Sequence, residues 1–247
     1  MTFKDHFSGH AAEYARFRPR YPEPLFAYLA EISPARDAAW DCATGNGQAA
    51  VMLAAQFAKV IATDASEQQI ASAELCDNVD YRVAPAEASG IASRSIDVVT
   101  VAQALHWFDI PAFFAEATRV LKPRGAIAVW AYNLLTVSPE IDALVHEFYS
   151  ETTGPYWPPE RVIVEAGYRG VDFPFEPIAP PDFAMESSWT ADQLFGYLRT
   201  WSATKRFIAD RGFDPVDALA DKVRPLWTDG TRVVHWPVMM RVGRVPA

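Results

Sequence analysis

Short apolar runs alternate with amphipathic segments through the first half of the chain. Runs rich in β-branched residues predict strands, and segments with apolar side chains three or four positions apart predict helices. The β-branched run at 95–104 is typical of a central strand that is buried on both faces. This half contains predicted strands at 38–40, 60–63, 81–84, 95–104 and 126–132, and predicted helices at 8–17, 24–31, 49–57, 66–75 and 110–121.

The pattern changes after residue 132, where helical segments and proline-rich loops replace the regular alternation. The alternation before that point indicates parallel strands joined by right-handed crossovers. We therefore predict an α/β fold, a doubly wound, mostly parallel sheet of seven strands with a helical cap inserted after strand five. The second half contains predicted helices at 140–149, 160–166, 191–201 and 215–227, and predicted strands at 183–189 and 233–242.

Two glycines lie in the stretch from Asp41 to Gln48, between the first predicted strand and the helix that follows it. Glycines at the end of a strand allow a sharp turn and let a ligand approach the main chain, which the free N–H groups of the next helix then face. The second apolar run ends in Asp64, whose carboxylate can accept hydrogen bonds from both hydroxyls of a ribose. These two neighbouring strand ends predict a nucleoside-binding crevice.

The glycine turn also fits a dinucleotide site, because residues 45–50 follow the pattern Gly-x-Gly-x-x-Ala. A nicotinamide-dependent oxidoreductase is therefore an alternative. Asp41 argues against it, since a carboxylate just before the turn would face the anionic pyrophosphate of the dinucleotide. The same carboxylate suits a cofactor that carries an ammonium group.

The chain is acidic, with a formal net charge of −9 over 247 residues. No run of Lys or Arg is long enough to follow a phosphate backbone, which excludes nucleic acid as an expected partner. No stretch approaches the roughly 18 apolar residues of a membrane span, and the first residues lack the apolar centre of a signal peptide. Cys42 and Cys76 have no metal-type spacing. We expect a cytoplasmic monomer or homodimer with no metal site and no membrane partner.

Several motifs together resemble the class I S-adenosylmethionine-dependent methyltransferases, in the branch of type 11 and trans-aconitate methyltransferase-like proteins. The resemblance covers nearly the whole chain and implies a Rossmann-like methyltransferase fold, with S-adenosylmethionine as cofactor and S-adenosylhomocysteine as product. The segments that carry it are 14–22, 41–48, Asp64, 85–87 and 103–109, and more loosely 197–202 and 236–237.

The resemblance also implies roles for individual residues. It assigns the glycine-rich loop to the methionine part of the cofactor, the end of the second strand to the ribose, the segment after Pro85 to the adenine, and the end of strand four to the methyl-bearing sulfur. The family's first loop glycine is Ala43 here, which requires a negative φ at that position, and Pro85 replaces an acid that many members use for adenine. The implied cofactor residues are Asp41, Ala43, Gly45, Gly47, Asp64, Ala65, Ala86, Glu87, Gln103 and Ala104.

The resemblance and the strand pattern together predict how the chain is divided. Ligands of open α/β sheets lie beyond the carboxyl ends of the strands, so insertions there form a roof over the ligand. The predicted parts are N-terminal lid helices at 1–34, a cofactor-binding core at 35–132, a cap or substrate region at 133–182 and 190–230, and the last strands at 183–189 and 231–247.

The methyl group of a sulfonium is already activated, so the protein has to align a nucleophile with it and exclude water. A carboxylate acceptor needs no base, whereas a hydroxyl or amine acceptor would use His106 as general base; the alternative for His106 is a structural residue beside Trp107. The alternative role for the tryptophans is packing between cap and core. The alternative role for the arginines of the N-terminal lid is solvation of a surface helix. Predicted acceptor residues are Tyr14, Arg18, Trp107, Tyr132, Trp157, Tyr197, Arg199 and Trp201, with Tyr156 as a further candidate.

The predicted function is methyl transfer from S-adenosylmethionine to a small-molecule acceptor, possibly a carboxylate, by in-line displacement. Two alternatives stay open at the level of sequence. The first is an NAD(P)-dependent oxidoreductase, which would bind NAD. The second is a non-catalytic cofactor-binding protein, which would bind S-adenosylmethionine and leave every acceptor unmethylated.

Overall fold

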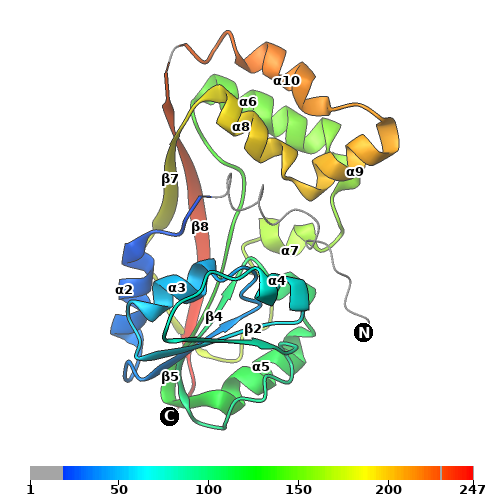
Figure 1. Cartoon of the computed structure of the whole chain (residues 1–247). Coiled ribbons are helices and arrows are strands. Elements are labelled where there is room, and N and C mark those ends of the chain that lie inside the picture. Colours follow the sequence, from blue (N-terminus) through cyan, green and yellow to red (C-terminus); the bar gives the residue numbers. More distant parts are fainter. Residues whose placement is uncertain (1–18, 229, 247) are drawn as a thin grey trace.

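A twisted β-sheet with helices on both faces forms one half of the molecule, and a layer of helices forms the other (Figure 1). The structure is a computed structural model that describes residues 19–228 and 230–246. Tyr14, Arg18 and the predicted helix at 8–17 lie outside the described residues. None of the described helices is long and apolar enough to cross a bilayer.

The first five strands are parallel, as the alternation of strands and helices predicts. The strand order along the sheet is β3-β2-β1-β4-β5-β8-β6, so the chain reverses direction across the sheet between β1 and β4. Ligands of such sheets bind at this switch point, beyond the carboxyl ends of the strands. The parallel strands are β1 (Ala38–Cys42), β2 (Lys59–Asp64), β3 (Val79–Val83), β4 (Ile96–Ala102) and β5 (Leu121–Tyr132).

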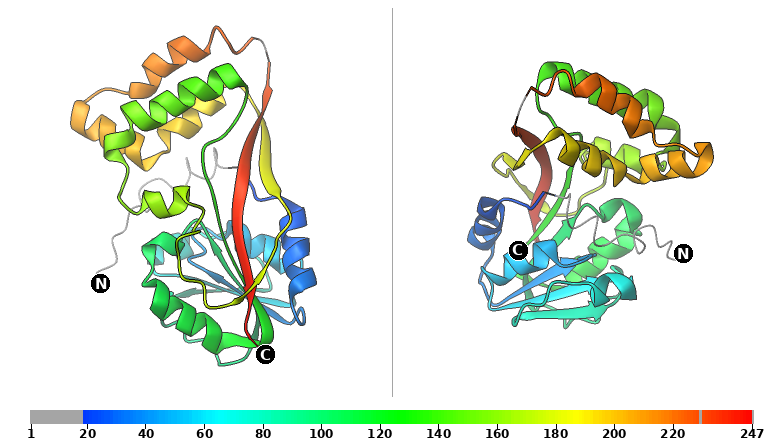
Figure 2. Two further views of the ribbon diagram at one scale, coloured as in Figure 1. Left: turned by 180° about the vertical axis from the view of Figure 1, so that it is seen from behind. Right: turned by 45° about the horizontal axis from the view of Figure 1, so that its top comes forward.

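The long strand β8 (Arg232–Arg244) joins the two halves of the molecule. Its residues 238–244 pair antiparallel with β5, and its residues 232–238 pair with β7 (Phe183–Trp189). The short strand β6 (Glu176–Ile178) occupies the sheet edge beside β8. The seven-stranded, mostly parallel sheet is confirmed along this path, and the predicted strand at 183–189 forms as β7, which pairs with β8 beside that path. There, β7 and the outer part of β8 form a ribbon that reaches the helical layer (Figure 2).

Each face of the sheet has its own hydrophobic core because side chains alternate along each strand. On β5, Ile127 and Val129 point to one core, while Ala128 and Trp130 point to the other. Helix α5 covers the first face, and helices α2 and α3 cover the second. Their bounds are α2 (Glu23–Ile32), α3 (Gln48–Ala54) and α5 (Ile110–Val120).

A third core lies inside the helical layer, which we define as α6, α8, α9 and α10 with the aromatic residues of β7 and β8 beneath them. Trp236 of β8 is fully buried there between Trp189 and Tyr197, and its Nε1 donates to Tyr197 Oη at 3.2 Å. The helices are α6 (Pro139–Glu147), α8 (Ala191–Arg199), α9 (Ser202–Arg211) and α10 (Pro215–Val223).

Two helices differ from the sequence prediction. Ser66 caps α4 (Glu67–Ala71) as expected, since its Oγ accepts from Gln69 N at 3.3 Å, but the helix ends at Ala71 and leaves Leu75 92% exposed. Helix α9 was not predicted at all. Its sequence is mostly polar and offers no apolar stripe of helical period, and only Ala203 and Thr204 are buried.

Candidate active site

The loop after β1 adopts an unusual backbone conformation. Ala43, Gly45 and Gly47 have φ values of +54°, +58° and +89°. A Cβ at Gly47 would lie 2.3 Å from Tyr81 Oη, so only glycine fits there without displacing that ring. The expectation that Ala43 keeps a negative φ is therefore wrong. The backbone amide of Thr44 donates to Thr63 O at 2.9 Å, which ties the loop to β2 and holds Ala43 in the left-handed region.

Asp41 lies beneath this loop at the end of β1 and is 1% exposed. Its two carboxylate oxygens accept from Thr44 Oγ1 at 2.5 Å and from Thr100 Oγ1 at 2.8 Å. Burial raises the pKa of Asp41 to about 6, although both hydrogen bonds act to lower it. A positive charge near the loop would favour the ionised form of Asp41, so binding of a cationic ligand there would lower the pKa of this carboxyl.

Asp64 at the end of β2 connects the two strand ends. Its Oδ2 accepts from Gly45 N at 2.9 Å, and its Oδ1 accepts from Ser66 N at 2.8 Å. An ionised carboxylate acts only as an acceptor, which is the hydrogen-bonding character that ribose hydroxyls need. The structure thus places Asp41, Gly45, Gly47 and Asp64 together, with the exposed Ala65 next to them.

The segment after β3 is anchored by carboxylates. Ala86 is 8% exposed, and Glu87 Oε1 accepts from Asp109 N at 2.9 Å, which directs the Glu87 side chain to the start of α5. Glu116 of α5 accepts from the backbone N of Ser89 at 2.9 Å and from Ser89 Oγ at 2.6 Å. These bonds fix the backbone on which the predicted adenine contacts depend.

Gln103 and the nearly buried Ala104 follow β4, at the edge where β1 and β2 also end. Gln103 has a φ of +58°, and its Nε2 donates to Tyr132 O at 3.0 Å at the end of β5. Non-glycine residues with positive φ cluster at functional sites, where the surrounding structure holds them against local strain. Ala43 and Gln103 show this feature on the two strands that flank the switch point.

His106 lies in the 3₁₀ turn η1 (Leu105–Trp107), with Nδ1 3.4 Å from Tyr168 Oη and its ring centroid 4.5 Å from that of Trp107. Burial, and after it the positive charge of Arg161, lower the pKa of His106 to about 4. The imidazole is therefore neutral near pH 7, but a base with so low a pKa removes protons weakly. This environment supports the structural alternative for His106.

Four of the predicted acceptor residues belong to the hydrophobic core of the helical layer or pack against it. The ring centroids of Trp157 and Trp201 are 5.6 Å apart, and those of Tyr197 and Trp201 are 5.9 Å apart. Tyr197, Trp201 and Tyr132 are buried in the core of the layer, which supports packing as their main role. Trp157 is only partly buried, and Trp107 is 36% exposed.

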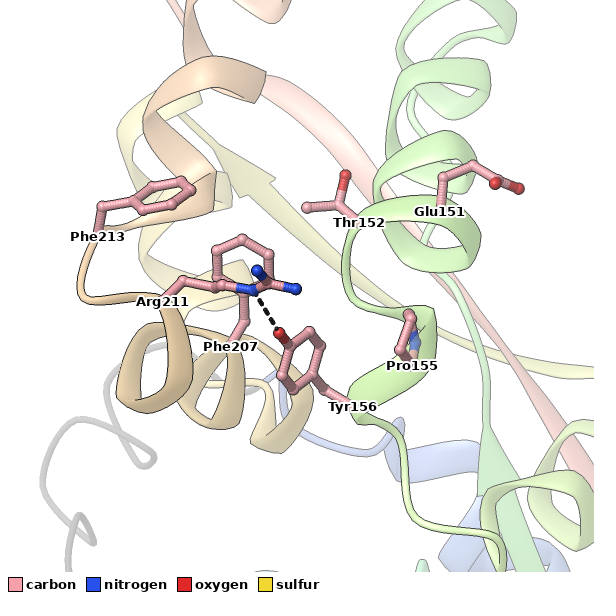
Figure 3. A pocket seen from close by; sticks show the side chains of 7 residues that line it. All are labelled: Glu151, Thr152, Pro155, Tyr156, Phe207, Arg211 and Phe213. Atoms are coloured by element: carbon pink, nitrogen blue, oxygen red, sulfur yellow. Dashed lines mark hydrogen bonds between the residues drawn. The ribbon is translucent and has the colours of Figure 1, made fainter.

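Arg199 and Tyr156 do not join this group. Arg199 Nε lies 2.5 Å from Asp214 Oδ2 and its Nη2 lies 2.8 Å from Asp217 Oδ1, so the start of α10 neutralises the charge that an acceptor would need. Tyr156 points into a surface pocket beside α9, where its hydroxyl donates to Asp210 at 2.6 Å and accepts from Arg211 Nε at 3.0 Å (Figure 3). Sequence alone does not reveal these pairings, because they form between segments that are distant in the chain.

Three residues that the sequence analysis did not select meet around the guanidinium of Arg161, whose charge acts on His106. Arg161 donates from Nε to Tyr149 Oη at 2.9 Å and from Nη2 to Asn133 Oδ1 at 3.4 Å. Asn133 directly follows β5 and is the first residue of the predicted cap region, from which Tyr149 and Arg161 also come. Their sequence neighbourhood contains no motif, and only the approach of helix α7 (Arg161–Glu165) to the sheet edge could have revealed them.

Comparisons with known proteins agree with this geometry. Residues 40–129 match the family described as a methyltransferase domain. A Dictyostelium discoideum protein named as a methyltransferase is 36% identical over 247 residues, which cover 96% of this chain and 94% of that protein. The solved structure of an Anaeromyxobacter dehalogenans protein, named as a type II methyltransferase, is 44% identical, covers 94% of this chain and all of that chain, and has a TM-score of 0.90.

A shorter match names the cofactor of the related protein. A Saccharomyces cerevisiae protein named as an S-adenosylmethionine-dependent methyltransferase is 30% identical over 131 residues, which cover 49% of this chain and 45% of that protein. The matched family segment contains the glycine loop, Asp64 and Gln103, which are the positions where the strand ends meet. The chain belongs to the class I S-adenosylmethionine-dependent methyltransferases, and its cofactor is S-adenosylmethionine.

Proposed function

We propose that this chain transfers the methyl group of S-adenosylmethionine to a small-molecule acceptor that carries a carboxylate. The observation that supports the cofactor site best is the link between Gly45 and Asp64. This link holds a carboxylate, the acceptor type that binds ribose hydroxyls, beside the glycine-containing turn that follows β1. The net charge of −9 and the absence of a basic run in the sequence argue against a nucleic-acid acceptor.

The residues at the strand ends fit the parts of the cofactor. In this proposal Asp64 and Ala65 hold the ribose, and the backbone at Ala86 and Glu87 borders the adenine. The loop with Asp41, Ala43, Gly45 and Gly47 receives the methionine part, whose ammonium group would favour the ionised form of the buried Asp41. Gln103 and Ala104 border the sulfur.

The cofactor supplies an activated methyl group, so the protein mainly has to orient the acceptor and exclude water. An ionised carboxylate attacks the methyl group without losing a proton. Its methylation therefore needs no general base, and the low pKa of His106 does not hinder it. We assign His106 a structural role beside Trp107 and Tyr168. A hydroxyl or amine acceptor would instead need His106 as general base.

The proposal extends to the setting of the enzyme. We propose a cytoplasmic monomer or homodimer, in which residues 133–182 and 190–230 act as the substrate region and residues 35–132 as the cofactor core. Cys42 and Cys76 are free thiols, which is consistent with a reducing compartment.

Calorimetric titration with S-adenosylmethionine, S-adenosylhomocysteine and NAD in parallel tests the cofactor site. We expect the first two to bind and NAD not to bind. Asp64→Ala should weaken S-adenosylhomocysteine binding by about 1 to 3 kcal/mol, because two ribose hydroxyls lose their acceptor. Asp77→Ala, which removes an exposed carboxylate before β3, is the matched control and should leave the affinity unchanged.

Two results would contradict the proposal. Unchanged affinity in Asp64→Ala would mean that the ribose is held elsewhere, and binding of NAD alone would favour the oxidoreductase alternative. Methyl transfer is then measured as release of S-adenosylhomocysteine with a panel of small carboxylic acids. A protein that binds the cofactor but methylates none of them, nor any alcohol or amine tested beside them, would be the non-catalytic alternative.

A further inference from the structure

Arg161 places a cation at the edge of the sheet where the acceptor must lie. Helix α7, which begins at Arg161, lies between the sheet and the helical layer (Figure 1 and the left view of Figure 2). The guanidinium donates to Asn133, the first residue after β5, and its charge acts on His106, which follows β4. The proposed cofactor residues follow β1 to β4, and those after β4 border the sulfur, so the acceptor must lie near the ends of β4 and β5.

The guanidinium is held in one orientation by several contacts. Nε donates to Tyr149 Oη at 2.9 Å, and the Tyr149 hydroxyl in turn donates to Glu165 in a short hydrogen bond. The guanidinium carbon lies 4.9 Å from the ring centroid of Trp157 and 5.5 Å from that of Tyr149. A planar guanidinium fixed by stacking loses little further conformational freedom when it binds a ligand.

Donors remain available on this fixed group. A guanidinium has five N–H bonds, and among the described residues only Nε and Nη2 have recorded acceptors, at Tyr149 and Asn133. Glu165 lies at 3.8 Å from Nε, beyond hydrogen-bond distance, and among the described residues it is the carboxylate that pairs with this guanidinium. Arg199, by contrast, has two carboxylates within 2.8 Å. The Arg161 side chain is 21% exposed, so a ligand can reach it.

We propose that Arg161 binds the carboxylate of the methyl acceptor through its Nη donors, with the indole of Trp157 beside the planar part of the acceptor. Tyr149 and Glu165 are positioning residues that hold the Nε side of the guanidinium. Two parallel N–H bonds from a guanidinium match the geometry of a carboxylate. This inference rests on the proposed function and names the residue that selects the acceptor.

The test uses the full chain saturated with S-adenosylhomocysteine. Calorimetry measures binding of benzoate, trans-cinnamate and hexanoate, each compared with its own amide, and of phenyl phosphate. We expect at least one acid to bind at least about tenfold more tightly than its amide, because the amide loses the charge-assisted bonds. Arg161→Gln should abolish this preference, and Arg161→Lys should restore little of it, since an ammonium does not reproduce the guanidinium fork.

Arg224→Gln is the matched control, because Arg224 also stacks on an aromatic ring, Phe195, and pairs with a carboxylate, Asp192. It should keep the preference for the acid. Tyr149→Phe should reduce the preference by about threefold, because the guanidinium loses its Nε acceptor. In every variant the affinity for S-adenosylhomocysteine and the thermal midpoint are measured and should not change.

The outcomes separate the two proposals. Failure of the wild-type chain to bind S-adenosylhomocysteine would remove the proposed function itself. If that binding is intact, the Arg161 inference is overturned when no acid is preferred over its amide, when Arg161→Gln retains the preference, or when phenyl phosphate is preferred over every carboxylate.

Discussion

Ala43 is a non-glycine residue in the left-handed region, with a φ of +54°. This conformation costs an L-residue about 1 to 2 kcal/mol, whereas glycine adopts it freely at a cost in chain entropy of about 0.5 to 1 kcal/mol. Ala43→Gly should therefore raise the free energy of unfolding by about 0.5 to 1 kcal/mol, as measured by urea denaturation. Ala65→Gly, an exposed position without a positive φ, is the control and should not stabilise the chain. A loss of stability in Ala43→Gly would show that the loop is unstrained.

Asp41 and His106 should have opposite effects on stability as the pH falls. The pKa of Asp41 rises on folding from 3.8 to about 6, so the folded chain binds the extra proton in this range and gains stability on acidification. The pKa of His106 falls from 6.5 to about 4, so the unfolded chain binds the extra proton and the fold loses stability on acidification. Each shift corresponds to about 3 kcal/mol, and in the wild-type chain the two contributions largely cancel.

Single substitutions should reveal this cancellation. Between pH 7 and pH 4, Asp41→Asn should lose about 2 to 4 kcal/mol more unfolding free energy than the wild type, and His106→Gln should lose correspondingly less. Urea denaturation at pH 7, 5.5 and 4 measures both. Equal pH profiles for the three proteins would mean that neither group is shifted.

At the scale of elements, Glu116 connects helix α5 to the loop that follows β3. Hydrogen bonds from Arg119, and then from Ser89, lower the pKa of Glu116 to about 2, and its side chain is 9% exposed. Glu116→Gln should lower the free energy of unfolding at pH 7 by about 1 to 3 kcal/mol, because the buried network loses its negative charge and one of its two acceptor oxygens. It should also weaken S-adenosylhomocysteine binding, since the loop carries the predicted adenine contacts.

The control for this change is Glu147→Gln. Glu147 is 57% exposed and pairs only at the surface with Lys222 at 3.1 Å, so its loss should cost less than about 1 kcal/mol. Chemical denaturation and calorimetry are measured on both variants. If Glu116→Gln is as stable as Glu147→Gln, the network does not anchor the loop.

Element types followed from the sequence wherever the hydrophobic period was strong. All five parallel strands and the helices between them lie where the periodicity places them, apart from shifts of a few residues at their ends. Helix α9 and strand β6 were missed for a common reason. Helix α9 is mostly polar and strand β6 is very short, so both depend on contacts with segments distant in sequence. Strand β6 pairs with residues 242–244 of β8, and α9 packs beside the pocket around Tyr156.

At the scale of the whole molecule, the helical layer has a hydrophobic core separate from those of the sheet. Trp236→Ala should remove its largest buried ring and cost about 3 to 5 kcal/mol of unfolding free energy. S-adenosylhomocysteine affinity should change little, because the proposed cofactor residues lie on the sheet. Thermal unfolding with and without S-adenosylhomocysteine, together with calorimetry, measures both effects.

Phe213→Ala is the control for a large side chain that is already 59% exposed, and it should cost less than about 1 kcal/mol. The result that contradicts this account is a Trp236→Ala protein that is as stable as Phe213→Ala. A protein that keeps its fold but loses cofactor binding would instead show that the helical layer and the sheet act as one unit.

The sequence by itself determined the sheet and the strand ends of the site, because both depend on local patterns. Alternating apolar runs specify parallel strands, and the glycine turn and Asp64 are brought together by any parallel pairing of β1 and β2. Only the tertiary structure decided which partners the arginines and the aromatic side chains of the predicted acceptor region contact. Arg199 is neutralised by Asp214, whereas Arg161 reaches Asn133, because long side chains from distant segments meet only after the helical layer has packed.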